Sequence, residues 1–319
     1  MSKMILTAAA ILLAGITVAS AEYPERPITI TVGASAGGGA DIQARILAER
    51  LTEKLGQQVL VENQPGAGSN IASQNLAKAA PDGYTINVAG AAIAINHTLY
   101  ADPGFDSLKD FIPVAGWGTT PLIFVAHPSV EANTLQELAD LSKANPGTLN
   151  YGNGIGFPNH MVMELFKLES GADIQFVPYP GMAPARTDVI GGQIEVSVDS
   201  IDSAAPFIET GQLKALAVTT PERLEKYPDI PTTAEAGYPN INKGAWYAIM
   251  APAGTPKEIV DKLASAIADV QRDPVAVEKM QAGGSTPMIS SSEEFAKWFA
   301  DQVNTWANVI NEAKLEKVQ

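Results

Sequence analysis

The sequence predicts an α/β fold built on largely parallel sheets. Segments rich in apolar and β-branched residues alternate, almost throughout, with segments whose apolar residues recur at helical spacing. Glycine-rich turns join several of these strand–helix pairs. Such alternation is typical of strands connected by crossover helices, which leaves neighbouring strands parallel. With 46 % apolar residues and no cysteine, the chain must rely on a packed core rather than on disulfides.

Short apolar segments bounded by turn residues are predicted to be strands, and the first has the sequence Ile-Thr-Ile-Thr-Val. These strands are Ile28–Val32, Gln58–Glu62, Tyr84–Ala89, Leu122–Ala126, Leu149–Tyr151, Gln175–Pro178, Glu195–Val198, Lys214–Val218 and Trp246–Met250.

The segments between the strands place apolar residues three and four positions apart, as amphipathic helices do. These helices are Asp41–Leu55, Ile71–Ala79, Leu135–Ala144, His160–Gly171, Ala183–Ile190, Ser203–Glu209, Pro256–Gln271 and Ser292–Lys314. The last is long and opens with a cap-like Ser-Ser-Glu-Glu sequence. No Pro/Ser-rich linker divides the chain, so composition alone places no domain boundary.

The first 21 residues have the anatomy of a secretory signal peptide. Lys3 supplies the positive charge, Ile5–Val18 is an uncharged apolar run, and Ala19-Ser-Ala21 is a small-residue cleavage site. The apolar run is about 14 residues, shorter than the ~20 needed to span a bilayer. We therefore expect cleavage after Ala21 and a soluble, exported mature chain that starts at Glu22.

Removal of Lys3 leaves 20 basic and 35 acidic residues, a net charge of about −15. Such a field repels nucleic acid and anionic membrane surfaces, so neither is expected as a partner. It also repels anionic ligands at long range. An anion site in this chain must therefore act through local backbone dipoles.

The turn Gly37-Gly-Gly39 provides such dipoles, because it leaves backbone N–H groups uncovered where the helix Asp41–Leu55 begins. Three further strand–helix turns resemble it, at Gln64–Asn70, Tyr151–His160 and Val177–Ala185. In open α/β sheets, ligands gather at the carboxyl ends of strands, where these turns meet. An anion-binding receptor is the function that these turns favour.

Other kinds of site find little support in the sequence. Gly66-Ala-Gly68 lacks the third glycine of a dinucleotide-binding turn, and no glycine loop is followed by Lys-Ser or Lys-Thr. The three histidines are about 30 residues apart and form no metal-binding pair, so neither a metal nor a cofactor is expected. Asp41 and Asp199 lie at positions that favour helix N-caps. Capping a helix is therefore the alternative to a ligand-binding role for these two residues.

A secreted serine hydrolase is the sharpest rival interpretation. Gly33-Ala-Ser-Ala-Gly37 matches the G-x-S-x-G nucleophile elbow between a strand and a helix, with Ser35 as the nucleophile. A general base for it is hard to find, because the second half of the chain contains no histidine. Small-residue patterns also arise easily by chance in a chain with 27 glycines.

Eight sequence blocks, in order along the mature chain, resemble one family. They are Tyr23-Pro-x-Arg-Pro27, Ala36-Gly-Gly-Gly-x-Asp41, Val61-Glu-Asn-x-Pro-Gly-Ala-Gly68, Ala77-Lys-Ala-Ala-Pro-Asp-Gly-Tyr84, Val177-Pro-Tyr179, Gly191-Gly-Gln193, Gly211-x-Leu-Lys-Ala-Leu-Ala-Val218 and Ala251-Pro-Ala-Gly-Thr-Pro256. In these blocks the chain resembles the periplasmic receptors of tripartite tricarboxylate transporters, also called Bug receptors.

The resemblance implies a two-lobed, hinged periplasmic binding protein of the Venus-flytrap kind, with a largely parallel sheet in each lobe. Residues 22–124 and 236–319 would form the first lobe, and residues 125–235 the second. It further implies a periplasmic monomer, without catalytic activity, that delivers a small carboxylate to integral-membrane transporter subunits. The ligand would be held by backbone amides, hydroxyls and ordered waters, not by an arginine. A sensory receptor that reports to a membrane kinase could use the same clamp.

The ligand-binding residues that the resemblance implies fall on the turns described above. In the first lobe they are Ser35, Gly37, Gly38, Gly39, Asp41, Gly90 and Ala91. In the second lobe they are Gly152, Asn153, Gly156, Pro158, His160, Gly181, Pro184, Ala185 and Asp199.

One departure from the family pattern lies beside the proposed anion cradle. Family members commonly carry Pro-Phe-Pro where this chain has Gly33-Ala34-Ser35. The vacated space predicts a larger ligand, such as an aromatic or longer-chain carboxylate. The alternative is that another side chain, for example Trp117, Phe157 or Trp246, fills the space and leaves the pocket unchanged.

Overall fold

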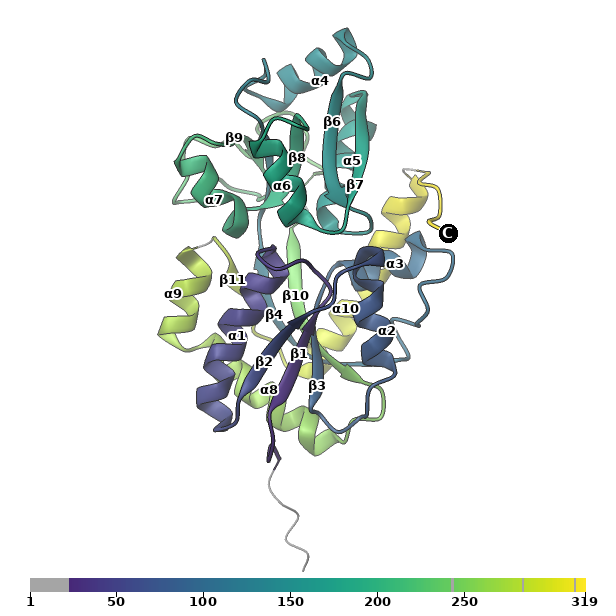
Figure 1. The fold of residues 1–319 in the computed structure, drawn as a ribbon, viewed down its shortest axis with the longest axis vertical. Helices are drawn as coiled ribbons and strands as arrows, with labels where there is room; N and C mark the ends of the chain where they lie inside the picture. The colour runs from purple at the N-terminus through teal and green to yellow at the C-terminus, as the bar shows by residue number, and fades with distance from the viewer. Residues whose placement is uncertain (1–22, 242–243, 283, 313) are drawn as a thin grey trace, which may run out of the picture.

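The computed structural model describes residues 23–241, 244–282, 284–312 and 314–319. The expected signal peptide, residues 1–21, lies outside the described residues. Two lobes are stacked along the long axis of the molecule, each built on its own sheet (Figure 1). The two-lobed α/β fold predicted from the sequence is therefore confirmed.

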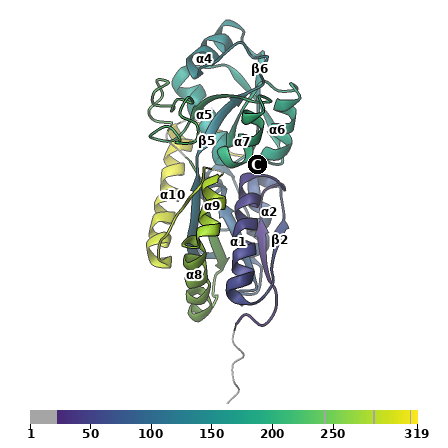
Figure 2. The same cartoon turned by 90° about the vertical axis from the view of Figure 1, so that its left-hand side faces the viewer.

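The first lobe contains a six-stranded sheet in the order β11-β4-β10-β3-β1-β2. Its strands are β1 (Ile28–Val32), β2 (Val59–Asn63), β3 (Thr85–Gly90), β4 (Phe111–Thr120), β10 (Ala245–Pro252) and β11 (Thr286–Pro287). Its helices are α1 (Gly39–Leu55), α2 (Asn70–Ala77), α3 (Ala92–Leu99), α8 (Lys257–Gln271), α9 (Pro274–Ala282) and α10 (Ser292–Glu312), with a short 3₁₀ turn at Ala67–Ser69. Helices α1, α8 and α9 cluster along one side of the molecule (Figure 2), while α3 packs against α10.

The second lobe contains a five-stranded sheet in the order β7-β6-β8-β5-β9. Its strands are β5 (Leu122–Ala126), β6 (Leu149–Gly154), β7 (Ile174–Tyr179), β8 (Val196–Ser200) and β9 (Lys214–Val218). Its helices are α4 (Leu135–Ala144), α5 (Pro158–Ser170), α6 (Met182–Ile190) and α7 (Ile201–Glu209). The second sheet begins directly after Pro121, and the predicted lobe boundaries after residues 124 and 235 stay predictions.

Each sheet combines a parallel block with antiparallel strands. In the first lobe β1 pairs in parallel with β2 and β3, and in the second β6 pairs in parallel with β7 and β8. Strands β10 and β5 run antiparallel to their neighbours, because the chain enters them from the other lobe rather than through a crossover helix. The parallel blocks are the parts of the sheets that the alternating sequence pattern predicted.

The two lobes touch through a polar network centred on Gln43 of α1. Its Nε2 donates to Oδ2 of Asp202 in the second lobe (3.1 Å) and to Oγ of Ser285 (3.0 Å). Its Oε1 accepts from Nε1 of the buried Trp117 at 3.0 Å. Helix α1 is thereby tied to the central sheet of its own lobe and to the start of α7 in the other.

Among the described residues, no helix combines the length and the apolar character required to cross a membrane.

Candidate functional site

The six parallel strands of the two lobes end at a single cavity. Strands β1, β2 and β3 lead into α1, α2 and α3, while β6, β7 and β8 lead into α5, α6 and α7. Each of these helices contributes its cap residue or its first residue to the cavity wall. These residues are Gly38, Ser69 and Ala91 from the first lobe, and Phe157, Met182 and Ser200 from the second.

None of these six helix starts carries a side-chain cap. Of the helices that begin away from the cavity, α4 is capped, since Oγ1 of Thr134 accepts from the backbone N–H of Glu137 at 3.1 Å, whereas α8 has no side-chain cap. The first N–H groups of a helix need an acceptor, and the helix dipole places about half a positive charge at the same end. The cavity is therefore surrounded by backbone donors suited to an anion.

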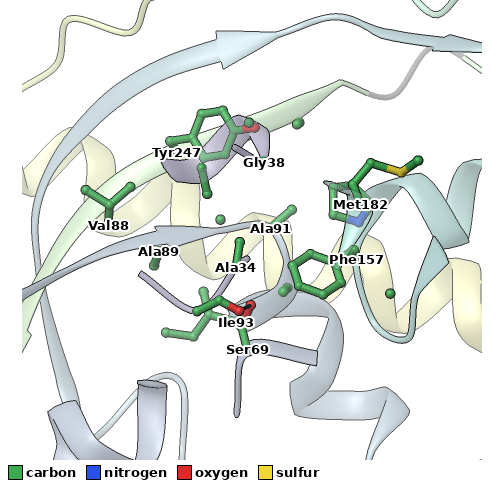
Figure 3. A pocket seen from close by; sticks show the side chains of 18 of the residues that line it. Ala34, Gly38, Ser69, Val88, Ala89, Ala91, Ile93, Phe157, Met182 and Tyr247 are labelled. Carbon is green, nitrogen blue, oxygen red and sulfur yellow. Dashed lines mark hydrogen bonds between the residues drawn. The ribbon is translucent and has the colours of Figure 1, made fainter. Parts of the chain in front are cut away.

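The cavity has a volume of about 60 Å³, and Figure 3 shows its wall. No aspartate, glutamate, lysine, arginine or histidine is among the described residues that line it. The polar side chains at the wall are Ser69, Ser73, Asn87, Asn153, Asn159, Ser200 and Tyr247, and the large apolar ones are Val88, Ile93, Phe157, Met182 and Trp246. An anion in this cavity is held without a cationic side chain.

The asparagines at the wall are oriented from behind by the sheets. Nδ2 of Asn87 donates to the carbonyl and Oγ1 of Thr31, each at 2.9 Å, and Nδ2 of Asn159 donates to the carbonyl of Val198 at 3.0 Å. Oδ1 of Asn153 is buried and has no partner among the described atoms. This oxygen is available to accept a hydrogen bond from a ligand hydroxyl.

Of the sixteen residues predicted to bind ligand, six line the cavity: Gly38, Gly39, Gly90, Ala91, Asn153 and Pro158. The other ten lie beside or behind the wall, and their contact with a ligand stays a prediction.

Ser35, Gly37 and Gly181 lie where the two lobes meet at the edge of the cavity. A Cβ atom on Gly181 would stand 2.6 Å from Oγ of Ser35, and the carbonyl of Gly37 accepts from a guanidinium nitrogen of Arg186 at 3.5 Å. The hydroxyl of Ser35 is buried and has no partner among the described atoms. It is therefore free to donate to a ligand that reaches this edge.

Asp41 braces the glycine turn instead of facing the cavity. Its carboxylate accepts from the backbone N–H of Gly37 (2.9 Å), from Nε of Arg45 (3.0 Å) and from Nδ2 of Asn63 (3.0 Å). Burial acts to raise the pKa of this carboxyl, but the hydrogen bonds outweigh burial and lower the pKa below its usual value. The charged carboxylate of Asp41 thus fixes the conformation of the turn, with the backbone amides at the start of α1 directed to the cavity.

Asp199 is engaged by a buried arginine. Nε of Arg186 donates to its Oδ2 at 2.6 Å, and the backbone N–H of Ser200 donates to its Oδ1 at 2.7 Å. Complete burial raises the pKa of Asp199, an effect that the adjacent guanidinium opposes. The ion pair fixes α6 to the end of β8, directly behind the wall.

His160 and Gly156 shape the loop that leads into α5. The His160 ring is stacked on Phe176 with the centroids 4.4 Å apart, and burial lowers its pKa to about 4, so it is neutral at neutral pH. A Cβ atom on Gly156 would stand only 2.0 Å from Oδ1 of Asn96, and its φ of 77° also favours glycine. Both residues position the backbone near the cavity.

Gly152, Pro184 and Ala185 pack β6 against α6. A Cβ atom on Gly152 would stand 2.3 Å from Cδ1 of Ile194 and 3.2 Å from Cβ of Ala185, so a larger residue here would force these side chains to shift. Pro184 lies in the first turn of α6. These three residues support the wall from behind.

The arrangement around Ser35 does not form a hydrolase triad. Its hydroxyl accepts or donates no hydrogen bond among the described atoms, so no base activates it. His160 is stacked within the second lobe, and Nδ1 of His127 pairs with Oγ of Ser129 at 2.7 Å. No described group of three His, Asp or Glu side chains could hold a metal ion either.

Several residues of the wall were not predicted from the sequence, including Ser69, Asn87, Met182, Ser200 and Tyr247. Two of them had a usable signal, since Ser69 and Met182 lie within turns that were singled out. Tyr247 had none, because it comes from a strand that returns from the second lobe.

Comparisons with known proteins agree with this geometry. Residues 43–315 match the model of the "Tripartite tricarboxylate transporter family receptor" family. Protein BugT of Bordetella pertussis is 36 % identical over 299 residues, which cover 92 % of this chain and 92 % of BugT. A solved structure from R. palustris with adipate has a TM-score of 0.89 at 32 % identity and covers 92 % of this chain and 99 % of its own. MatC from Rhodopseudomonas palustris with bound malate has a TM-score of 0.86 at 28 % identity and covers 90 % of this chain and 100 % of its own.

Proposed function

Because this chain belongs to the tripartite tricarboxylate transporter receptor family, we propose that it captures a small carboxylate in the periplasm and delivers it to transporter subunits in the membrane. The family is one of solute-binding receptors and not of enzymes. The solved relatives with adipate and with malate support a carboxylate as the class of ligand.

The observation that carries the proposal is the ring of six uncapped helix starts around a cavity without charged side chains. Three of the helix starts belong to each lobe, so a carboxylate between them is bound by both lobes at once. Its oxygens accept from backbone amides, and the methylene groups lie against the alanines and Phe157. Closure of the lobes then excludes water, which strengthens each of these hydrogen bonds.

Calorimetric titration of the mature protein tests this proposal. Malate, succinate and adipate are the acids to compare with succinamide, a neutral analogue that keeps the size of succinate. We expect at least one of the acids to bind and to raise the melting temperature by mass action, while succinamide does neither. Equal binding of succinate and succinamide would contradict a site built for an anion.

We expect the receptor to discriminate against amino acids. Aspartate differs from malate by an ammonium in place of a hydroxyl, and no carboxylate lines the cavity to pair with it. The positive helix ends also disfavour a buried cation. Aspartate should bind at least roughly tenfold more weakly than malate in the same titration. A preference for aspartate would show that an acidic group reaches the ligand.

Replacement of Ser35 by alanine tests the role of the buried hydroxyl at the cavity edge. If Ser35 donates to the bound carboxylate, Ser35→Ala should weaken binding by about 1–3 kcal/mol, the value of a hydrogen bond to a charged group. Ser129→Ala, at a surface serine paired with His127, is the control and should bind as the parent does. Covalent labelling of Ser35 by a fluorophosphonate would instead favour the hydrolase interpretation.

A further inference from the structure

The first lobe presents mostly small side chains to the cavity. Gly33, Ala34, Ala72 and the segment 89–92 line it, and only Val88 and Ile93 among their neighbours are larger aliphatic residues. Ala34 is 8 % exposed, so its methyl group is part of a closed wall. These small side chains leave room beside position 34 for a bulky group, whereas Trp246 and Tyr247 of the same lobe line the cavity with large aromatic rings.

The second lobe fills much of that room with Phe157, the cap residue of α5. Figure 3 shows its ring entering the cavity toward the side lined by Ala34 and Ile93. The ring packs against the same apolar cluster that contains Ala34. Relatives commonly have an aromatic residue where this chain has Ala34, and Trp117, Phe157 and Trp246 are the side chains that could take its place. Phe157 and Trp246 line the cavity, whereas Trp117 does not.

The position of the Phe157 ring depends on Gly154. A Cβ atom at residue 154 would stand 2.3 Å from Cδ2 and 2.5 Å from Cε2 of the ring, so the ring lies directly on the glycine backbone. The turn is further closed by the backbone N–H of Phe157, which donates to the carbonyl of Gly154 at 3.4 Å. The ring therefore has a fixed depth in the cavity.

With the ring in place, the cavity of about 60 Å³ is well below the ~150 Å³ of an apolar cavity that holds benzene. We propose that Phe157 sets the length of the ligand and restricts the receptor to short carboxylates, of about four carbons. Because the residue belongs to the second lobe, it measures the ligand only when the lobes close. This inference rests on the proposed function, and it adopts the alternative in which another side chain fills the space beside position 34.

The test is a titration series with malonate, succinate, glutarate and adipate. Phe157→Ala removes the ring and should raise the ratio of adipate to succinate affinity on the order of tenfold, since each of the two additional methylenes gains apolar contact. Gly154→Ala should also change the length preference, because the new methyl group takes the space that the Phe157 ring occupies on the glycine backbone.

Two further variants control the interpretation. Phe207→Ala makes the same substitution on α7, where the ring packs in a separate apolar cluster, and should leave the length preference unchanged. The double variant that carries both Ala34→Phe and Phe157→Ala has an aromatic ring on the first lobe in place of the one on the second. It should regain the preference for short acids. Circular dichroism and melting temperature confirm that each variant is folded.

The outcomes separate this inference from the proposed function. If the parent binds acids and Phe157→Ala keeps the parent's length profile, Phe157 does not set ligand length and the inference is wrong. If the parent binds none of the acids, the proposed function fails and the inference fails with it. A shift toward adipate in Phe157→Ala alone, reversed in the double variant, supports both.

Discussion

Gly39→Val should weaken ligand binding strongly while leaving the protein folded. A Cβ atom on Gly39 would stand 2.5 Å from the hydroxyl of Tyr247 and 2.7 Å from Oγ of Ser200. Ser200 belongs to the second lobe, so the branched side chain would hold the lobes apart and cover the amides at the start of α1. We expect the affinity for the carboxylate to fall at least roughly 100-fold, equivalent to about 2.7 kcal/mol.

The melting temperature without ligand distinguishes this effect from misfolding. Separation of the lobes relieves the contact with Ser200, whereas the contact with Tyr247 lies within the first lobe and requires its ring to shift, so the melting temperature of Gly39→Val should fall modestly and remain that of a folded protein. Gly191→Val is the matched control, since Gly191 is exposed at the end of α6 and a Cβ atom there meets its nearest neighbour at 3.4 Å. Binding by Gly39→Val at the parental affinity would mean that α1 does not form the ligand cradle.

Of the substitutions proposed here, Arg186→Met should reduce the free energy of unfolding most. Its side chain is 9 % exposed and that of Asp199 is completely buried, so Arg186→Met leaves a carboxylate without a partner inside the second lobe. Breaking such a buried pair costs about 3–5 kcal/mol in the free energy of unfolding. Arg223→Met is the control, because the Arg223–Glu235 pair is exposed and screened by water, so its loss should leave the free energy of unfolding nearly unchanged.

The pH dependence of the Arg186→Met defect follows from its cause. Without the guanidinium, burial raises the pKa of Asp199 further above its value in the unfolded chain. The folded state then holds a proton that the unfolded state has released, so stability falls as the pH rises. Denaturant titrations should therefore show a small defect near pH 4 and the full defect at pH 7. Adding Asp199→Asn should recover most of the loss, and a defect independent of pH would contradict the mechanism.

Much of the fold follows from local sequence pattern, but the exceptions are informative. Strand β4 was not predicted, because Pro113, Gly116 and Gly118 resemble turn residues. The glycines are required there by close packing: Cβ atoms at 116 and 118 would stand 2.7 Å from Sδ of Met288 and 2.9 Å from the carbonyl of Thr286. Helix α3 was missed because its first turns are buried on all sides and show no polar face. Strand β11 and helix α9 were also missed.

The turns that form the site were predicted, but the individual residues within them were less certain. Asp199 and Ser200 are consecutive at the end of β8, where successive side chains point to opposite faces. Ser200 lines the cavity, whereas the preceding residue, Asp199, pairs with Arg186 behind the wall. Neighbouring residues of one strand therefore have different roles. Glycine patterns identify where the backbone turns, whereas the face that each side chain occupies depends on the packing of both lobes.

The ring of uncapped helix starts has an energetic consequence for motion. Six like poles face one another across the cavity when the lobes meet, and like poles repel. Closure around a neutral solute leaves this repulsion in place, whereas a carboxylate converts it into attraction from both sides. For the carboxylate receptor proposed above, the charge of the ligand is therefore what holds the two lobes together. An uncharged molecule of the same shape should fail to do so.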